Sequence, residues 1–311
     1  MKKDNLKKIE KDFSLESHNS MGIKCIADYF MEIKNESDIA YGINFARENR
    51  IPYFVLGKGS NIILPKRYKG LVIFMATKKI DIKHKKEKLI VFAQAGVFLP
   101  DIAKEVSYKG GAGLEWAGGV PGTIGGAVRG NAGAFGDFIS DYISRIDVFD
   151  IKKGEKTSFE REDLDFGYRE SFFKKTKRYI VLGVEMEFPT KKDTVERYQE
   201  YLDYREKNHP QEPSAGSIFK NPKTDKDILK DKRLERFEEI GFVPARFLIE
   251  EAGLKGKIIG GAQVSEKHPN FIINIGGVTK EDIEELIETI KRQVKDVFGI
   301  EMNEEVDMSI V

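Results

Sequence analysis

The sequence of 311 residues lacks several features that would mark particular classes of protein. Its one cysteine, Cys25, excludes an internal disulfide and favours a reducing compartment. No apolar run approaches the length of a membrane span, and the charged opening segment lacks the apolar stretch of a signal peptide. The 52 basic and 51 acidic residues leave a net charge of +1, which gives no sign of a nucleic-acid or membrane surface. We therefore expect a cytoplasmic protein with no nucleic-acid or membrane partner.

Common catalytic motifs are missing too. The four histidines stand far apart, without the spacing of metal ligands, so we predict no metal site. The sequence has no G-x-S-x-G motif, which would carry the nucleophile of a hydrolase. It also has no Gly-Lys-Ser/Thr at the end of a glycine loop, as a Walker phosphate loop requires. With neither a metal nor an activated nucleophile in view, we expect the chemistry to belong to a bound organic cofactor.

What the sequence has instead is glycine in one stretch. Residues 110–136 hold eleven of the 29 glycines. Glycine loses more conformational freedom on folding than any other residue, so such a cluster favours unusual backbone geometry or a close approach to a ligand. Successive N–H groups without side chains can bind an anion, which predicts a phosphate-bearing cofactor. Trp116, the only tryptophan, and small apolar residues argue against a solvated linker.

A shorter glycine loop follows the strand-like run 52–56, with the sequence Gly57-Lys58-Gly59-Ser60-Asn61. It lacks the third glycine of a Rossmann fingerprint, as the longer stretch lacks the strand–loop–helix order. Together the two loops suggest one extended dinucleotide held from two sides.

The remaining pattern predicts a mixed α and β chain. Apolar spacing predicts helices over 37–49 with Ser37 as cap, 98–108, 191–209 with a solvated charged face, 244–252, and a long helix after Thr279. Thr279 and Asp282 form a capping box, and the buried stripe of that helix consists of Ile283, Leu286, Ile287, Ile290, Val294 and Val297. Strands are predicted around 52–56, 62–76, 79–94, 143–188 and 271–275. Residues 1–12 are predicted to be a polar arm or short helix, and a boundary is predicted at 209–213.

Five motifs carry a resemblance to a known family. GKGSN, EWAGGVPGTIGGAVRGNAGAFG, DFGYRES, PSAGSIFKNP and GGAQVSEKHPNFIIN occur in this order over nearly the whole chain. They are similar to the UDP-N-acetylenolpyruvoylglucosamine reductases, and the chain resembles the shorter form without an extra substrate-covering insertion. The resemblance implies NADPH-dependent, FAD-mediated reduction of the enolpyruvyl group of UDP-N-acetyl-3-O-(1-carboxyvinyl)-glucosamine to UDP-N-acetylmuramate for peptidoglycan. The implied partner is this UDP-sugar, and we expect a monomer.

The implied fold class is α+β. A two-lobed FAD-binding domain of the vanillyl-alcohol-oxidase (PCMH-like) type would precede a C-terminal α/β substrate-binding domain. The expected boundaries are 1–76 and 77–206 for the two lobes, with the tail 298–311 returning to the second lobe, and 207–297 for the substrate domain.

The resemblance also implies site residues. The flavin pyrophosphate would lie against Gly57, Gly59, Ser60, Asn61, Pro121, Gly122, Thr123, Ile124, Gly125 and Gly126, and the flavin nearer Asn131, Gly133 and Ala134. Because neither loop contains histidine or cysteine, we expect the FAD to be non-covalent. The implied catalytic residues are Arg169, Ser217 and Glu305, with Tyr168 and Asn221 binding the substrate.

Some alternatives stay open. Arg169 could form a surface ion pair, Ser217 could be a turn residue and Glu305 a solvated carboxylate, with Glu304 as the substitute. Asp307 stands where the family usually has a basic residue; on a strand it would share a face with Glu305 and disfavour its ionisation, or it faces solvent. An oxygen-using FAD oxidase and a non-catalytic nucleotide-binding protein are the other functions. The SAGSIFKNP motif argues against the first, and the three catalytic residues together argue against the second.

Overall fold

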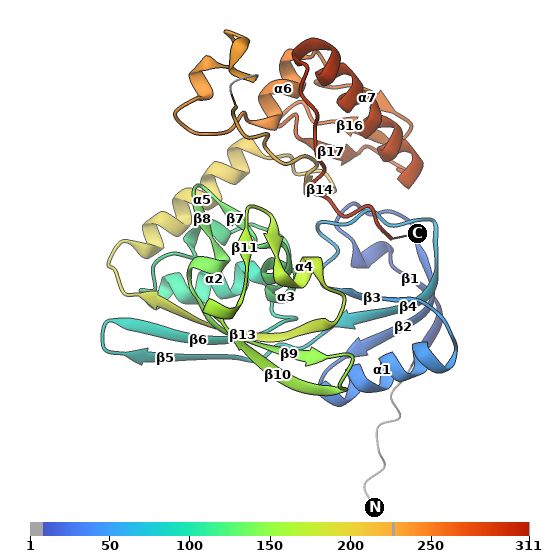
Figure 1. Cartoon of the computed structure of the whole chain (residues 1–311), viewed down its shortest axis with the longest axis vertical. Coiled ribbons are helices and arrows are strands. Elements are labelled where there is room, and N and C mark those ends of the chain that lie inside the picture. Colours follow the sequence, from blue (N-terminus) through green and yellow to red (C-terminus); the bar gives the residue numbers. More distant parts are fainter. Residues whose placement is uncertain (1–8, 226–227, 311) are drawn as a thin grey trace, which may run out of the picture. The chain divides into compact units, whose positions relative to one another are not determined.

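The computed structural model describes residues 9–225 and 228–310, and the chain divides into two compact units (Figure 1). The first unit contains the described residues up to Phe13, with 27–58 and 69–205. The second contains 14–26, 59–68 and the described residues from 206 onward. Each unit has its own apolar core, so each is described by itself.

Two sheets build the first unit. The order of the four-stranded sheet is β1-β2-β4-β3, and β3 pairs with β4 in parallel. Its elements are β1 (Glu10–Ser14), β2 (Ile26–Ile33), α1 (Glu36–Glu48), β3 (Tyr53–Leu56) and β4 (Arg67–Met75). The order of the five-stranded sheet is β10-β9-β13-β6-β5, with antiparallel pairs throughout. Its strands are β5 (Ile80–Lys85), β6 (Lys88–Gln94), β9 (Ile143–Asp150), β10 (Glu155–Glu160) and β13 (Tyr179–Pro189).

Helices and two small hairpins cover this second sheet (Figure 1). The helix α3 packs on β13 and β6, and α2 packs on β6. Trp116 is almost fully buried in the same core, as expected for a glycine stretch that folds into the protein. The remaining elements of the unit are α2 (Leu99–Tyr108), α3 (Ile124–Gly130), β7 (Gly133–Ala134), β8 (Asp137–Phe138), β11 (Phe166–Gly167), β12 (Glu170–Ser171), α4 (Phe172–Lys175) and α5 (Thr194–Asn208).

The second unit is a smaller antiparallel sheet with two helices. The strand order is β14-β17-β16-β15, and α7 packs on β15, β16 and α6. The elements are β14 (Ser214–Ser217), α6 (Ala245–Glu251), β15 (Ile258–Ile259), β16 (Ala262–Val264), β17 (Phe271–Asn274) and α7 (Lys280–Phe298). The predicted capping box of α7 is present, because Thr279 Oγ1 accepts from Asp282 N and the Asp282 carboxylate accepts from Thr279 N. Gly299 ends the helix in the left-handed conformation.

The structure corrects several local predictions. The N-cap of α1 is Asn35 rather than Ser37, because Asn35 forms a capping box with Asp38. Residues 10–12 belong to β1 instead of a helix, while residues 1–8 lie outside the described chain. Val297 is 39% exposed, and the last turn of α7 turns Phe298 towards the core instead.

The tail after α7 is held by short backbone contacts. Within the described residues it forms isolated bridges, Ile62 with Asp307 and Phe219 with Glu304, in place of a regular strand. These contacts lie inside the second unit.

Candidate active site and glycine loops

The two glycine loops meet in the first unit. Gly57 follows β3, and a Cβ atom on Gly57 would lie 2.5 Å from Thr123 Oγ1. Thr123 is the N-cap of α3, and its hydroxyl accepts a hydrogen bond from Gly126 N at 3.3 Å. The close approach requires a residue without a side chain at position 57.

Some backbone N–H groups of the longer glycine loop donate hydrogen bonds to other parts of the protein. Ile124 N donates to Val97 O at 2.9 Å, and Gly125 N donates to Ala95 O at 2.8 Å. Among the described residues, the N–H groups of Gly122 and Thr123 have no acceptor. Unpaired backbone donors in a glycine loop suit a phosphate group, so this loop fits a dinucleotide cofactor.

The shorter motif is divided between the units. Gly57 and Lys58 belong to the first unit, whereas Gly59, Ser60 and Asn61 belong to the second. Gly59 has a left-handed φ of +62°, and a Cβ atom there would lie 2.2 Å from His18 O. Asn61 Nδ2 donates to Glu305 O at 3.3 Å. The motif expected to bind the flavin therefore also touches the tail that carries the predicted catalytic glutamate.

A tight hairpin, β11–β12, carries Tyr168 and Arg169 at its tip. Arg169 has a φ of +56°, a left-handed conformation that costs a non-glycine residue about 1–3 kcal/mol. The Arg169 guanidinium lies 5.1 Å from the centre of the Tyr168 ring. Lys174 Nζ donates to Arg169 O at 3.1 Å and supports the turn from α4. The two residues predicted from DFGYRES are therefore neighbours on a constrained turn.

Asn131 links this hairpin to the end of the glycine stretch. It is 3% exposed and is the left-handed C-cap of α3, with a φ of +44°. Its Nδ2 donates to Gly167 O at 2.9 Å, and its Oδ1 accepts from Ser140 N at 3.4 Å. Asn131 thus holds the Tyr168–Arg169 turn, a structural contact that the sequence did not reveal.

The sequence interpretation also missed Arg205 on α5, whose charged face was predicted to be solvated. Burial lowers the pKa of Arg205 to about 10, and its Nε has no hydrogen-bond acceptor among the described residues. Its Nη2 donates to Trp116 O at 3.0 Å, and its guanidinium lies 5.8 Å from the ring centre of Phe135, at the tip of the β7–β8 hairpin. A desolvated cation beside Phe135, which follows Gly133 and Ala134 in the chain, fits an anionic or strongly polar cofactor group.

In the second unit, a β-bulge sets the position of Ser217. Ser214 pairs with Ile273 and Ser217 with Phe271, so β14 has one residue more than β17 between the two pairs. Gly216 has a φ of +77°, which suits the extra residue of a bulge. Ser217 is half-buried. It ends a strand rather than occupying a turn.

The tail places Glu305 beside this serine. Glu305 N donates to Ile218 O at 2.8 Å, directly after Ser217. The alternative glutamate, Glu304, has its carboxylate in an ion pair with Lys291. Asp307 Oδ1 accepts from Ser309 N at 3.0 Å and from Ser309 Oγ at 2.6 Å. The structure therefore brings Ser217 and Glu305 together and gives Glu304 a separate partner.

Asn221 does not line, but lies near, a basic surface cavity of about 390 Å³ in the same unit. Its Oδ1 accepts from Ala245 N at 2.9 Å, and the neighbours of Ala245 in the chain line the cavity. The lining side chains include four cations, one acid and two phenylalanines: Arg236, Arg246, Lys255, Lys267, Glu250, Phe237 and Phe247. Cations beside aromatic rings form a surface that can bind a nucleotide.

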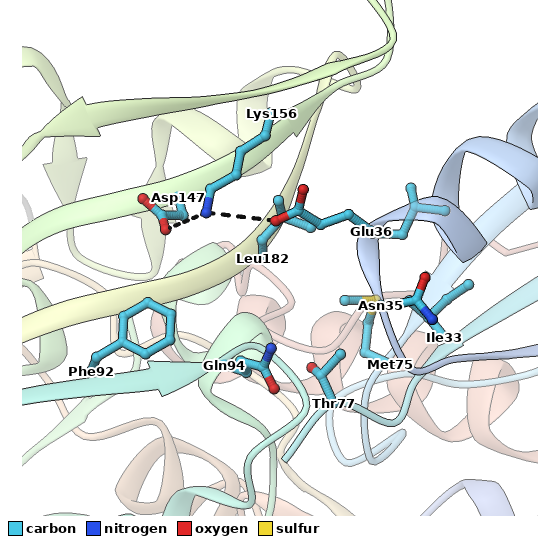
Figure 2. Close-up of a pocket in the computed structure, with 11 residues that line it drawn as sticks. Ile33, Asn35, Glu36, Met75, Thr77, Phe92, Gln94, Asp147, Lys156 and Leu182 are labelled. Atoms are coloured by element: carbon cyan, nitrogen blue, oxygen red, sulfur yellow. Dashed lines mark ion pairs between the residues drawn. The ribbon is translucent and has the colours of Figure 1, made fainter. Parts of the chain in front are cut away.

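A second cavity, in the first unit, has a different character (Figure 2). It measures about 60 Å³, room for roughly two waters, and none of the predicted site residues lines it. Lys156 Nζ lies 2.9 Å from Asp147 Oδ2 and 3.5 Å from Glu36 Oε1 at its edge. Burial opposes ionisation of Asp147, but hydrogen bonds from Lys156 and Ser158 outweigh it and lower the pKa of this carboxyl. The cavity is a small ion-pair site, too small for a cofactor.

The described residues contain no group of three His, Cys, Asp or Glu side chains that could hold a metal ion. Nor does any helix in the described ranges have the length and apolar character needed to cross a membrane.

Comparisons with known proteins give the family. Residues 27–159 match the family described as FAD binding domain, and residues 208–309 match the C-terminal domain of UDP-N-acetylenolpyruvoylglucosamine reductase. The chain is 36% identical to the UDP-N-acetylenolpyruvoylglucosamine reductase of Prochlorococcus marinus, covering 96% of this chain and 97% of that protein. It is 38% identical to the reductase of Clostridium botulinum, covering 95% and 90% respectively.

A solved structure agrees. The crystal structure of the reductase from Thermus caldophilus matches with a TM-score of 0.77 at 28% identity, over 97% of this chain and 99% of that chain. The predicted fold class, an FAD-binding domain of the PCMH type followed by a reductase C-terminal domain, is confirmed. The chain belongs to the UDP-N-acetylenolpyruvoylglucosamine reductase family.

Proposed function

We propose that this FAD-dependent oxidoreductase uses Arg169, Ser217 and Glu305 to reduce the enolpyruvyl group of its UDP-sugar substrate with electrons from NADPH. The product is UDP-N-acetylmuramate, a precursor of peptidoglycan. The observation that carries the residue assignment is the hydrogen bond from Glu305 N to Ile218 O, which places Glu305 beside the residue that follows Ser217.

The bound FAD supplies hydride chemistry, so the protein must bind the substrate, stabilise charge and deliver a proton. Hydride addition at the β-carbon of the enolpyruvyl group builds negative charge on the α-carbon and its carboxylate. Ser217 would give its hydroxyl proton to the α-carbon. An ordinary hydroxyl is a weak acid, but an enolate-like carbon is a strong enough base to accept the proton.

Arg169 and Glu305 would act on the substrate carboxylate. The planar guanidinium of Arg169 can bind a carboxylate with two parallel hydrogen bonds and stabilise the developing charge. The left-handed backbone of Arg169 supports this role, because strained residues cluster at functional sites. Glu305, when protonated, would donate a hydrogen bond to the same carboxylate.

We propose that backbone donors hold the non-covalent FAD. Gly57, Gly122 and Thr123 would bind its phosphates in the first unit, with Gly59, Ser60 and Asn61 supplied by the second. The remaining predicted contacts are Pro121, Ile124, Gly125, Gly126, Asn131, Gly133 and Ala134. Acid or heat should release the flavin into the supernatant, and flavin that stays attached to the denatured chain would refute the non-covalent assignment.

Tyr168, Asn221 and the basic cavity beside Asn221 would bind the substrate. Arg246 lies at the cavity, so Arg246→Ala should raise KM for the UDP-sugar about tenfold while the rate of flavin reduction by NADPH stays normal. We further propose FAD-binding lobes at 1–76 and 77–206, a substrate domain at 207–297, the shorter form of the enzyme and a monomeric state.

Ser217→Ala tests the assignment by separating the two half-reactions. Reduction of the flavin by NADPH needs no acid at the substrate α-carbon, whereas reoxidation by the enolpyruvyl substrate does. We therefore expect stopped-flow measurements to show near-normal flavin bleaching but reoxidation slowed by about 10²–10⁴-fold. Ser217→Cys, which keeps a transferable proton, should recover part of the loss.

The matched control is Ser214→Ala, at the other end of the same strand. It should leave both half-reactions near normal. Equal slowing of both half-reactions by Ser217→Ala would mean that Ser217 shapes the loop, and normal turnover would remove it from the mechanism.

A further inference from the structure

The described residues after α7 run back along this helix as far as Ile310, and two lysines of the helix hold them. The chain reverses at Gly299, after which the tail passes Glu304 and Glu305 to reach Ile310. Lys291 forms an ion pair with Glu304. Lys280 Nζ donates to Ile310 O at 2.9 Å and to Met308 O at 3.3 Å. The two contacts bracket Glu305.

Lys280 lies where a lysine is unfavourable in two respects. It is the first residue of α7, where the helix dipole favours acidic rather than basic side chains. Its side chain is only 8% exposed, so its charge is largely removed from water. A lysine in this position needs compensation, and the two tail carbonyls and Glu284 Oε1 at 3.6 Å provide it.

The lysine ammonium group has three hydrogen-bond donors and no acceptor, and its three partners here are all oxygen atoms that can accept. Two of its three partners are backbone carbonyls of the tail, so the contact fixes the path of the tail whatever its side chains are. On the other side of Glu305 along the tail, the side chain of Lys291 is 27% exposed and that of its partner Glu304 is 32% exposed. Lys295 with Glu301 differs, because both side chains are more than half exposed and such pairs contribute little.

We propose that Lys280 and Lys291 are positioning residues that fix the tail so that Glu305 lies beside Ser217. This inference rests on the proposed role of Glu305. Lys280 holds the backbone of the tail and Lys291 holds the Glu304 carboxylate. The Glu305 N–H to Ile218 O and Asp307 N–H to Asn61 O bonds form only when the tail is in place.

Lys280→Met in the FAD-loaded full chain tests this. Methionine fills similar space without a charge, so the two carbonyl contacts are lost. Hydrogen exchange measured by mass spectrometry should show the Glu305 and Asp307 amides exchanging roughly 10- to 100-fold faster, the loss expected for charge-assisted hydrogen bonds. Reoxidation of the flavin by substrate should slow, with flavin reduction by NADPH unchanged. Lys280→Arg should restore part of the protection.

Two further variants keep the test decisive. Lys291→Met, at the more exposed lysine, should give a smaller change of the same kind even if Lys280→Met fails to fold. Lys295→Met should leave exchange and both half-reactions unchanged. In the double variant Lys280→Met with Glu305→Gln, reoxidation should be no slower than in Glu305→Gln alone.

The two hypotheses fail in different ways. If Glu305→Gln reoxidises at the normal rate, the catalytic role of Glu305 is wrong, whatever the exchange data show. If tail amides remain protected in both Lys280→Met and Lys291→Met, the positioning role is wrong, and the lysines serve only α7.

Discussion

The loop around Thr123 and the tail around Glu305 are held in different ways. Backbone groups fix the loop, through Ile124 N to Val97 O and Gly125 N to Ala95 O, and its glycines allow the close packing. The tail is fixed by segments far away in the sequence, since Asn61 contacts Glu305 across 244 positions. The loop around Thr123 can be recognised in the sequence from its glycines, whereas the position of the tail around Glu305 depends on the assembled fold.

The largest expected difference between the two units is their response to acid. Burial, with the nearby charge of Arg246, lowers the pKa of His268 in the second unit to about 4 from 6.5. Between these values the unfolded chain binds the proton and the native chain does not, so stability falls as pH drops from about 6.5 towards 4, by up to about 3 kcal/mol. In the first unit, the Arg178 guanidinium lowers the pKa of Asp150 to about 2. The stability that the ionised Asp150 gives the first unit is therefore lost only below about pH 4.

We therefore expect the second unit to unfold first on acidification. Trp116, the only tryptophan, reports on the first unit, so its fluorescence should change at lower pH than far-ultraviolet circular dichroism. His268→Phe should move the first transition to lower pH, while His84→Gln, at an exposed position on β5, should not. If fluorescence and circular dichroism changed at the same pH, the prediction that the second unit unfolds first would be wrong.

Gly57→Ala tests the loop built from backbone. The new Cβ atom would lie 2.5 Å from Thr123 Oγ1 and force the loops apart, at a cost of about 1–3 kcal/mol. We expect the Kd for FAD, from fluorescence titration of the apoprotein, to rise about 10- to 100-fold. Gly130→Ala is the matched control, because a Cβ atom there meets nothing within 4 Å. Unchanged affinity in the Gly57 variant would place the flavin phosphates elsewhere.

Asn131 allows a smaller and more local comparison. Asn131→Gly loses the side-chain bonds to Gly167 and Ser140 but keeps the left-handed backbone, whereas Asn131→Ala loses the bonds and adds backbone strain. In urea unfolding, the alanine variant should be about 1 kcal/mol less stable than the glycine variant. Equal stabilities would show that the backbone relaxes at this cap.

Asp307→Asn should have the smallest effect. An asparagine keeps the Oδ1 atom that accepts from Ser309, so the tail contact survives. We expect kcat within about twofold of the parent and an unchanged pH–rate profile. A shift of the alkaline limb to lower pH would instead show that the Asp307 charge acts on Glu305.

Local patterns in the sequence predicted the parts of the fold that depend on neighbours in the chain. The capping box of α7 was predicted from Thr279 and Asp282, and the glycine stretch was correctly expected to fold into the protein around Trp116. The motifs also indicated the family. In α1, the prediction of Ser37 as the cap is wrong: Asp38 stands three residues after Asn35, and the structure has the capping box that this spacing forms.

Other features depend on contacts between distant segments and were not predicted. Arg205 looks like a surface residue on a polar helix, and its burial comes from packing on the glycine stretch. The division of GKGSN between two units has no local signal. Lys280 is a basic residue at the start of a helix, where the helix dipole disfavours positive charge. This mismatch is a signal in the sequence from which a special role for Lys280 could have been inferred.

The position of Asn61 has a consequence for synthesis on the ribosome. Its partner Glu305 is made 244 residues later, which at about 5–20 residues per second takes roughly 12 to 50 seconds. During that interval the Asn61 amide lacks the Glu305 carbonyl that it contacts in the folded protein. The second unit can therefore complete its core only after this segment has been made, because Val306, directly after Glu305, belongs to that core.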